Sequence, residues 1–337
     1  MKRKLVSIIL TLMLVVTVVS GCSDNSYENY LRAVEKTDAQ TKYSGDFTIS
    51  MKADINIEGL TKEELKSVNL YNNLEVSNSY KSDKELGLIE SNLYINFGGL
   101  GFDIKYYDDS VKAFLKMPIV EKYVYMDDLS ALDSGMDIET PNMDYANFSD
   151  LISEESKDEI AKLWKDAIDQ DNIVKGKESL IETKEGEVKA TQYTIKYEDK
   201  MFKELILKSM LILYKDEKFK DAGLINLSNY ESRTSGEFDA ELLREEFIDI
   251  LVIENFEINA YIDIDGYIVK EDMDLVITSN TKGMNALEKL SVNYTSKMSN
   301  FGKDQNIIIP AKEDLEFMSR EEMENGLPSL FEDVFSR

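Results

Sequence analysis

Hydrophobic and polar residues alternate with a period of two along most of this chain, which predicts long β-strands with one buried and one solvated face. The first clear run lies at 46–57, where Phe47, Ile49 and Met51 alternate with polar neighbours. Later runs repeat this pattern, so antiparallel strands are the main element that we expect. We predict strands at 46–57, 70–76, 89–97, 102–107, 111–117, 122–126, 178–184, 187–197, 256–264, 267–277, 287–297 and 305–309.

Two pairs of strands carry turn residues between them. Asp265-Gly266 separates two alternating runs, and both positions of a tight hairpin turn favour residues that tolerate a positive φ. Glu185-Gly186 lies between the runs at 178–184 and 187–197. Both pairs are therefore predicted to be β-hairpins.

Helical spacing is confined to a few segments. Tyr27, Tyr30, Leu31 and Val34 follow the i, i+3, i+4, i+7 pattern of a short amphipathic helix. The same spacing predicts helices at about 150–170, 198–214 and 238–252, with a short helix at 329–335. The acidic, irregular segment 127–147 is interpreted as a surface loop.

These elements predict an α+β fold in which a large, curved antiparallel sheet forms a half-barrel. The apolar face of such a sheet must be covered, and the few helices are the available cover, so we expect them on its concave face. No linker rich in proline, glycine or serine divides the chain. We therefore predict one domain at 27–312, followed by a charged tail at 313–337.

The chain begins with the pattern of a secretory signal peptide. Lys2, Arg3 and Lys4 precede an apolar segment at 5–19. A membrane-spanning helix needs about 20 apolar residues, so this segment is short for a permanent anchor. We predict that residues 1–21 are removed.

The predicted signal peptide ends in Val19-Ser20-Gly21-Cys22, which resembles the bacterial lipobox. The resemblance implies that the Cys22 thiol receives a diacylglyceryl group and that signal peptidase II cleaves after Gly21. Two acyl chains anchor a protein stably, because each buried CH₂ contributes about 0.8 kcal/mol. Residues 22–26 then form a short tether, and the chain is expected on the extracytoplasmic face of the cell membrane.

Charge and composition exclude several functions. The chain has a net charge of −26, and losing three basic residues with the signal peptide makes it −29. So acidic a body repels nucleic acid. The chain contains no histidine, and its single cysteine is assigned to the lipid, which removes imidazole and thiol catalysis and disulfide formation.

Short motifs add no chemistry. Asp263 and Asp265 lack the EF-hand spacing, so the hairpin accounts for them. Ser279 and Lys282 match S-x-x-K but follow a strand instead of opening a helix. We expect no enzyme activity, no metal and no cofactor.

The order of elements resembles that of the LolA/LppX-like lipoproteins of Gram-positive bacteria. The resemblance covers about 27–312, and it rests on the lipobox, the leading helix and five segments: 174–178, 192–196, 261–272, 294–301 and 307–310. It implies a half-barrel around helices, with an apolar cavity that binds a lipid or another hydrophobic ligand.

Residue types suggest which side chains line such a cavity. Methionine adapts its shape, and tyrosine adds a polar tip to an apolar ring. The candidates are Tyr193, Tyr197, Met201, Met210 and Met273, each of which could instead be ordinary core. The alternative function is a ligand-free surface lipoprotein that holds another envelope protein.

Overall fold

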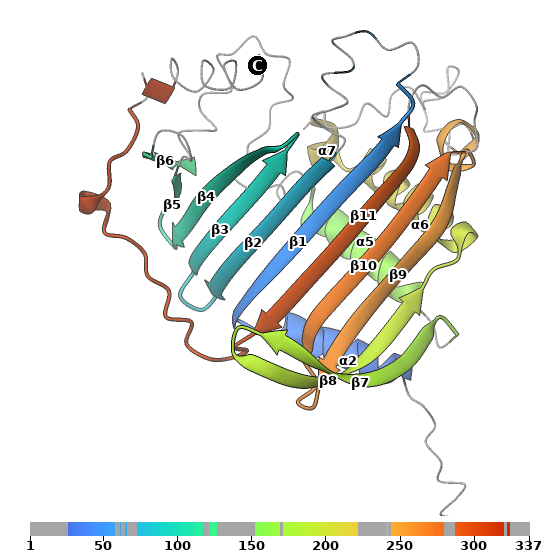
Figure 1. Ribbon diagram of the computed structural model, residues 1–337, viewed down its shortest axis with the longest axis horizontal. Coiled ribbons are helices and arrows are strands. Elements are labelled where there is room, and N and C mark those ends of the chain that lie inside the picture. The colour runs from blue at the N-terminus through green and yellow to red at the C-terminus, as the bar shows by residue number, and fades with distance from the viewer. Residues whose placement is uncertain are drawn as a thin grey trace, which may run out of the picture.

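An antiparallel sheet of eleven strands makes up most of this computed structural model (Figure 1). The structure describes residues 26–57, 61, 65, 73–116, 121–126, 152–168, 171–221, 241, 244–279, 287–319 and 322–323. The strands are β1 (Lys42–Ile55), β2 (Asn73–Asp83), β3 (Leu88–Phe97), β4 (Leu100–Asp109), β5 (Ala113–Lys116), β6 (Tyr123–Tyr125), β7 (Ile173–Thr183), β8 (Gly186–Lys196), β9 (Leu251–Asp263), β10 (Ile268–Ser279) and β11 (Leu287–Ser299).

Neighbouring strands follow the order β6-β5-β4-β3-β2-β1-β11-β10-β9-β8-β7. Most neighbours are consecutive in sequence, whereas β1 pairs with β11 along nearly its whole length. This one long-range pairing joins an N-terminal meander to a C-terminal meander. The sheet stays open because β6 and β7 are its edges, and the predicted α+β class is confirmed.

Helices α2 (Ser26–Asp38), α5 (Glu154–Asp166) and α6 (Asp199–Lys215) lie behind one face of the sheet, under its C-terminal half (Figure 1). They pack chiefly on β7, β9, β10 and one another. All three match predicted helices, and a fourth, α7 (Glu217–Asp221), is a short continuation of α6.

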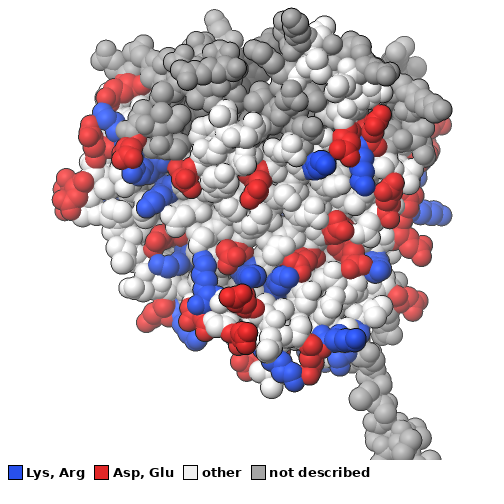
Figure 2. All heavy atoms as spheres, in the orientation of Figure 1, with Lys and Arg blue, Asp and Glu red and all other residues white. Residues whose placement is uncertain are grey.

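The helix-bearing face is called the inner face here. Residues directly opposite each other on paired strands share a face, and successive residues alternate between faces. Glu271 on β10 pairs with Ala260 and Ser296, and Ser296 pairs with Phe47 on β1, so these four lie on the inner face. The outer face carries charges of both signs without a patch of one sign (Figure 2).

Two predicted elements are wrong. Residues 305–309 form no strand, because Asn306 adopts a left-handed φ of 45° and the Ile308 amide donates to the Glu90 carboxylate, 3.4 Å away. The helix predicted at 238–252 does not reach its expected end. Residues 244–248 form a π-helical turn, and Leu251 already pairs with Ser279 as the start of β9.

The segment after β11 returns along the sheet toward β6. Lys312 forms an ion pair with Asp109 at 2.6 Å, and Phe317 stacks on Tyr125 with ring centroids 4.3 Å apart. Phe114, which is fully buried, contacts the same Phe317 ring. These contacts attach the beginning of the predicted tail to the N-terminal half of the sheet.

Candidate functional site

Four of the five predicted cavity residues meet in one cluster between the sheet and the helices, with Met201 contributed by α6 itself. Tyr193 and Tyr197 are buried there, and Met201 and Met273 pack against the same cluster. Met210 lies apart, beside Leu207 and Ile248. The structure thus brings most of the candidates together, in closely packed surroundings.

Aromatic rings fill the centre of this cluster. Phe256 of β9 contacts Phe202 of α6 at 4.5 Å and Tyr197 at 5.0 Å between ring centroids. Trp164 of α5 meets all three rings edge-on, and its indole N–H donates to Ser209 Oγ at 3.1 Å. This half of the inner face is therefore a packed core that fixes the sheet to α5 and α6.

Away from these helices, the inner face of β1–β4 is largely apolar, although Asn78 lies between Phe47 and Leu93 on it. The register places nine hydrophobic side chains on four adjacent strands, and each of them is only half-buried. Among the described residues, the buried cluster under the helices includes none of them. They are Phe47, Ile49, Met51, Leu74, Val76, Leu93, Ile95, Phe102 and Ile104.

Glu271 lies on the inner face at the border between the packed core and this apolar face. Its side chain points to the same face of β10 as those of Met273 and Leu275. Within the described part of the chain, no hydrogen bond or ion pair reaches its carboxyl group. Burial, and secondarily the nearby Asp38, raise the pKa of Glu271 above its ordinary value.

Tyrosines surround this carboxyl group and extend along the lower part of the face. Burial raises the pKa of Tyr30 and Tyr294, and the negative charge of Glu271 adds to both shifts. Tyr294 contacts Phe47 with ring centroids 6.3 Å apart. Farther along, burial beside Asp108 raises the pKa of Tyr106 to about 12. The apolar face therefore has one border of hydrogen-bonding groups, the phenols of these tyrosines and the carboxyl groups of Glu271 and Asp108.

Two hollows lined by described residues are small. One, of about 160 Å³, lies at the upper end of β1–β3 beside Lys52, Glu75 and Asn96. The other, of about 130 Å³, lies where the β7–β8 hairpin crosses the sheet, with Lys184 Nζ 2.5 Å from Ser79 Oγ. Ligand pockets usually measure about 300–1,000 Å³, so neither hollow is large enough for a lipid.

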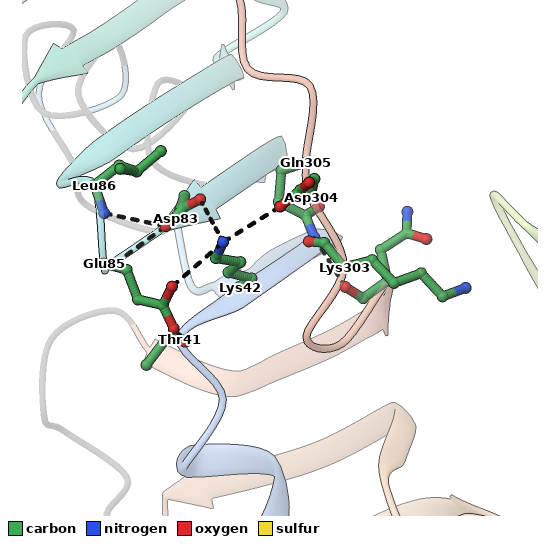
Figure 3. A network of polar contacts seen from close by, with 9 residues as sticks. Thr41, Lys42, Asp83, Glu85, Leu86, Lys303, Asp304 and Gln305 are labelled. Carbon is green, nitrogen blue, oxygen red and sulfur yellow. Dashed lines mark hydrogen bonds and ion pairs between the residues drawn. The ribbon is translucent and has the colours of Figure 1, made fainter.

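A polar network fastens the lower end of β1 (Figure 3). Lys42 Nζ lies 3.4 Å from Asp83, 3.3 Å from Glu85 and 3.3 Å from Asp304. The hydrogen bonds that Lys42 donates to Asp304 and Glu85 raise the pKa of Lys42 above its ordinary value. Because Asp304 follows β11, the network ties the C-terminal segment to the β1–β2 end, which is a structural role.

The predicted anchor residues Val19, Ser20, Gly21 and Cys22 lie outside the described residues, as does the predicted helix at 329–335. In the described part of the chain, no helix is long and apolar enough to cross a membrane.

Comparisons with known proteins give little further guidance. No family model matches the chain, and no curated protein matches it. Among solved structures, the lipoprotein LppX of Mycobacterium tuberculosis aligns over 86% of this chain and 99% of its own, with 7% identity and a TM-score of 0.31. With so low a score, the fold must be argued from this chain's own sheet and helices.

Glu271 and the bordering tyrosines were not among the residues singled out from sequence. Alternation around 267–277 places Glu271 in the apolar register, so a charge at an inward position was the available signal. The border role of Tyr294 depends on the pairing of β10 with β11, which local sequence does not reveal.

Proposed function

We propose that this chain is a membrane-anchored extracytoplasmic lipoprotein that binds a lipid or another hydrophobic ligand without catalysing a reaction. The observation that supports this proposal is the half-buried apolar face of β1–β4. Monomeric soluble proteins rarely expose large contiguous apolar patches, and such patches commonly mark binding sites. Lipidation of Cys22 would hold this face near a membrane.

The proposed site combines two parts of the inner face. The packed core under α5 and α6 holds the sheet rigid, so the candidates Tyr193, Tyr197, Met201 and Met273 would act mainly through the shape of the sheet. The nine side chains on β1–β4 would contact the ligand's hydrocarbon. Glu271 and Tyr294 would face its polar end.

A matched pair of variants on β1 tests the site, because neighbouring residues point to opposite faces. Ile49→Asn introduces an amide on the apolar face, and Thr48→Asn introduces the same amide on the outer face. Burying one isoleucine against a ligand contributes about 1.5–3 kcal/mol, or roughly 10–100-fold in affinity. We expect Ile49→Asn to weaken binding of a fluorescent fatty acid by that factor and Thr48→Asn to leave it within about twofold.

The measurement uses the chain from residue 23 onward, with thermal unfolding to show that both variants fold. Equal affinities for the two variants would place the ligand elsewhere. If the unmodified chain takes up no fatty acid and native mass spectrometry after lipid extraction finds no bound lipid, the binding function is refuted.

The second candidate is a ligand-free lipoprotein that holds an envelope protein. It is favoured by the aromatic packing under the helices and by the small size of the two hollows lined by described residues. Absence of lipid uptake, together with recovery of one envelope protein by crosslinking in cells, would select this function.

A further inference from the structure

The hairpin turns at the lower end of the sheet share one edge of the molecule. In an antiparallel sheet alternate turns lie at the same end, so the β2–β3, β4–β5 and β9–β10 turns lie together along the end where β1 begins (Figure 1). Each turn has a large aliphatic side chain: Leu86, Val111 or Ile264. These three residues define the lower rim.

The rim side chains are unusually exposed for their type. Leu86 is 60% exposed, Val111 81% and Ile264 95%. These positions belong to different strand pairs, so their exposure does not come from one misfitting loop. Turns normally favour glycine, proline, asparagine, aspartate or serine, so aliphatic residues at three turn tips have no local conformational reason.

Close to each rim residue, the ammonium group of a lysine lies over the ring of a tyrosine. Lys84, two residues before Leu86, lies 5.3 Å from the Tyr43 ring centroid. Lys112 lies 4.5 Å from the ring of Tyr125 and follows Val111 directly. At the third turn, Lys36 lies 4.2 Å from the Tyr267 ring and donates to the Asp265 carbonyl. Exposed aliphatic tips with tyrosine and lysine nearby are typical of the membrane interface.

The first helix lies along the same end. Thr37 Oγ1 accepts a hydrogen bond from the Ile268 amide at 2.9 Å, which fixes the C-terminal end of α2 at the β9–β10 turn. The 13 residues of α2 span about 20 Å. A tether from Cys22 to Ser26 adds at most about 14 Å at ~3.6 Å per residue. An acyl group on Cys22 is therefore within reach of a bilayer that touches the rim.

We propose that the lower rim inserts Leu86, Val111 and Ile264 into the head-group layer of the membrane that carries the lipid anchor. The occupant of this surface is a lipid bilayer, because three separate tips on one edge suit a broad, yielding surface. Glu85 and Asp265 lie in the same turns, so the rim is not basic and contact depends on the aliphatic tips more than on anionic lipid. The strands then rise from the membrane, with the lower border of the inner face beside the head groups.

The experiment measures how deeply single positions enter a membrane. The chain from residue 23 onward contains neither cysteine nor histidine. An N-terminal hexahistidine tag can therefore replace the lipid on nickel-chelating phosphatidylcholine vesicles, and single cysteines can be labelled with the fluorophore NBD. The test positions are Val111→Cys and Ile264→Cys. Ile57→Cys is the matched control, because Ile57 is 59% exposed beyond the opposite end of β1.

We expect lipids spin-labelled near the head group to quench NBD at positions 111 and 264 at least twofold more than at position 57. All three sites are exposed, so the labelled chains should fold alike, and circular dichroism checks this. Equal quenching at the three positions, or quenching at position 57 alone, would overturn the proposal. The fatty-acid assay with Ile49→Asn is separate, so failure of ligand binding and failure of rim contact can be told apart.

Discussion

The carboxyl group of Glu271, which no hydrogen bond or ion pair reaches within the described part of the chain, gives a pH-dependent prediction for Glu271→Gln. Burial raises the pKa of Glu271 in the folded chain, with Asp38 adding to the shift. In the unfolded chain a glutamate titrates near about 4.3. As pH rises through that value, the unfolded state releases a proton that the folded state keeps, so the stability of the unmodified protein falls.

The size of the effect follows from proton linkage. Between about pH 4.3 and the folded pKa of Glu271, the unmodified chain should lose about 1.4 kcal/mol of unfolding free energy per pH unit relative to Glu271→Gln. Below both pKa values the carboxyl group is neutral in both states, and the variant should match the parent. At neutral pH the variant should be the more stable protein.

Urea unfolding between pH 4 and pH 8 measures this difference, with the fluorescence of Trp164, the only tryptophan, as the probe. Glu75→Gln is the control for the loss of one negative charge, because Glu75 is exposed on the outer face. If Glu271→Gln is less stable than the parent at neutral pH, or behaves like Glu75→Gln throughout, the carboxyl group has a partner and the reasoning fails.

Three further changes test other parts of the structure. Gly45→Ala would place a methyl group 2.7 Å from the Tyr80 hydroxyl, and thermal unfolding should show a loss of about 1–3 kcal/mol. Burial alone would raise the pKa of Asp216, but hydrogen bonds, chiefly from Ser153, outweigh it and hold the pKa well below its ordinary value. Stability should therefore fall as acid protonates Asp216, and Asp216→Asn should cost about 1–3 kcal/mol and flatten this loss in urea titrations from pH 2 to pH 6. Cys22→Ser should abolish incorporation of labelled fatty acid in cells and release the chain from the membrane fraction, and unchanged membrane retention would contradict the predicted anchor.

Sequence alone determined the type and approximate position of most elements. Period-two alternation located β1, β3, β9 and β10, because each of these strands has one largely apolar and one largely polar face. Helical spacing located α5 and α6, because each helix has one apolar side that packs into the core. It was wrong near 250, where Ile250 and Leu251 fit either period, and only pairing with β10 makes Leu251 a strand residue.

The tertiary structure decided how deeply each region of the inner face is buried. The pairing of β1 with β11 joins the two meanders, and contacts so far apart in sequence leave no local pattern. Tyr197 and Ile49 have similar sequence surroundings, yet one is packed under helices and the other lies half-buried beyond them. Periodicity states which face a side chain takes, whereas the packing of α5 and α6 against β9 and one another decides whether that face becomes packed core or stays half-buried.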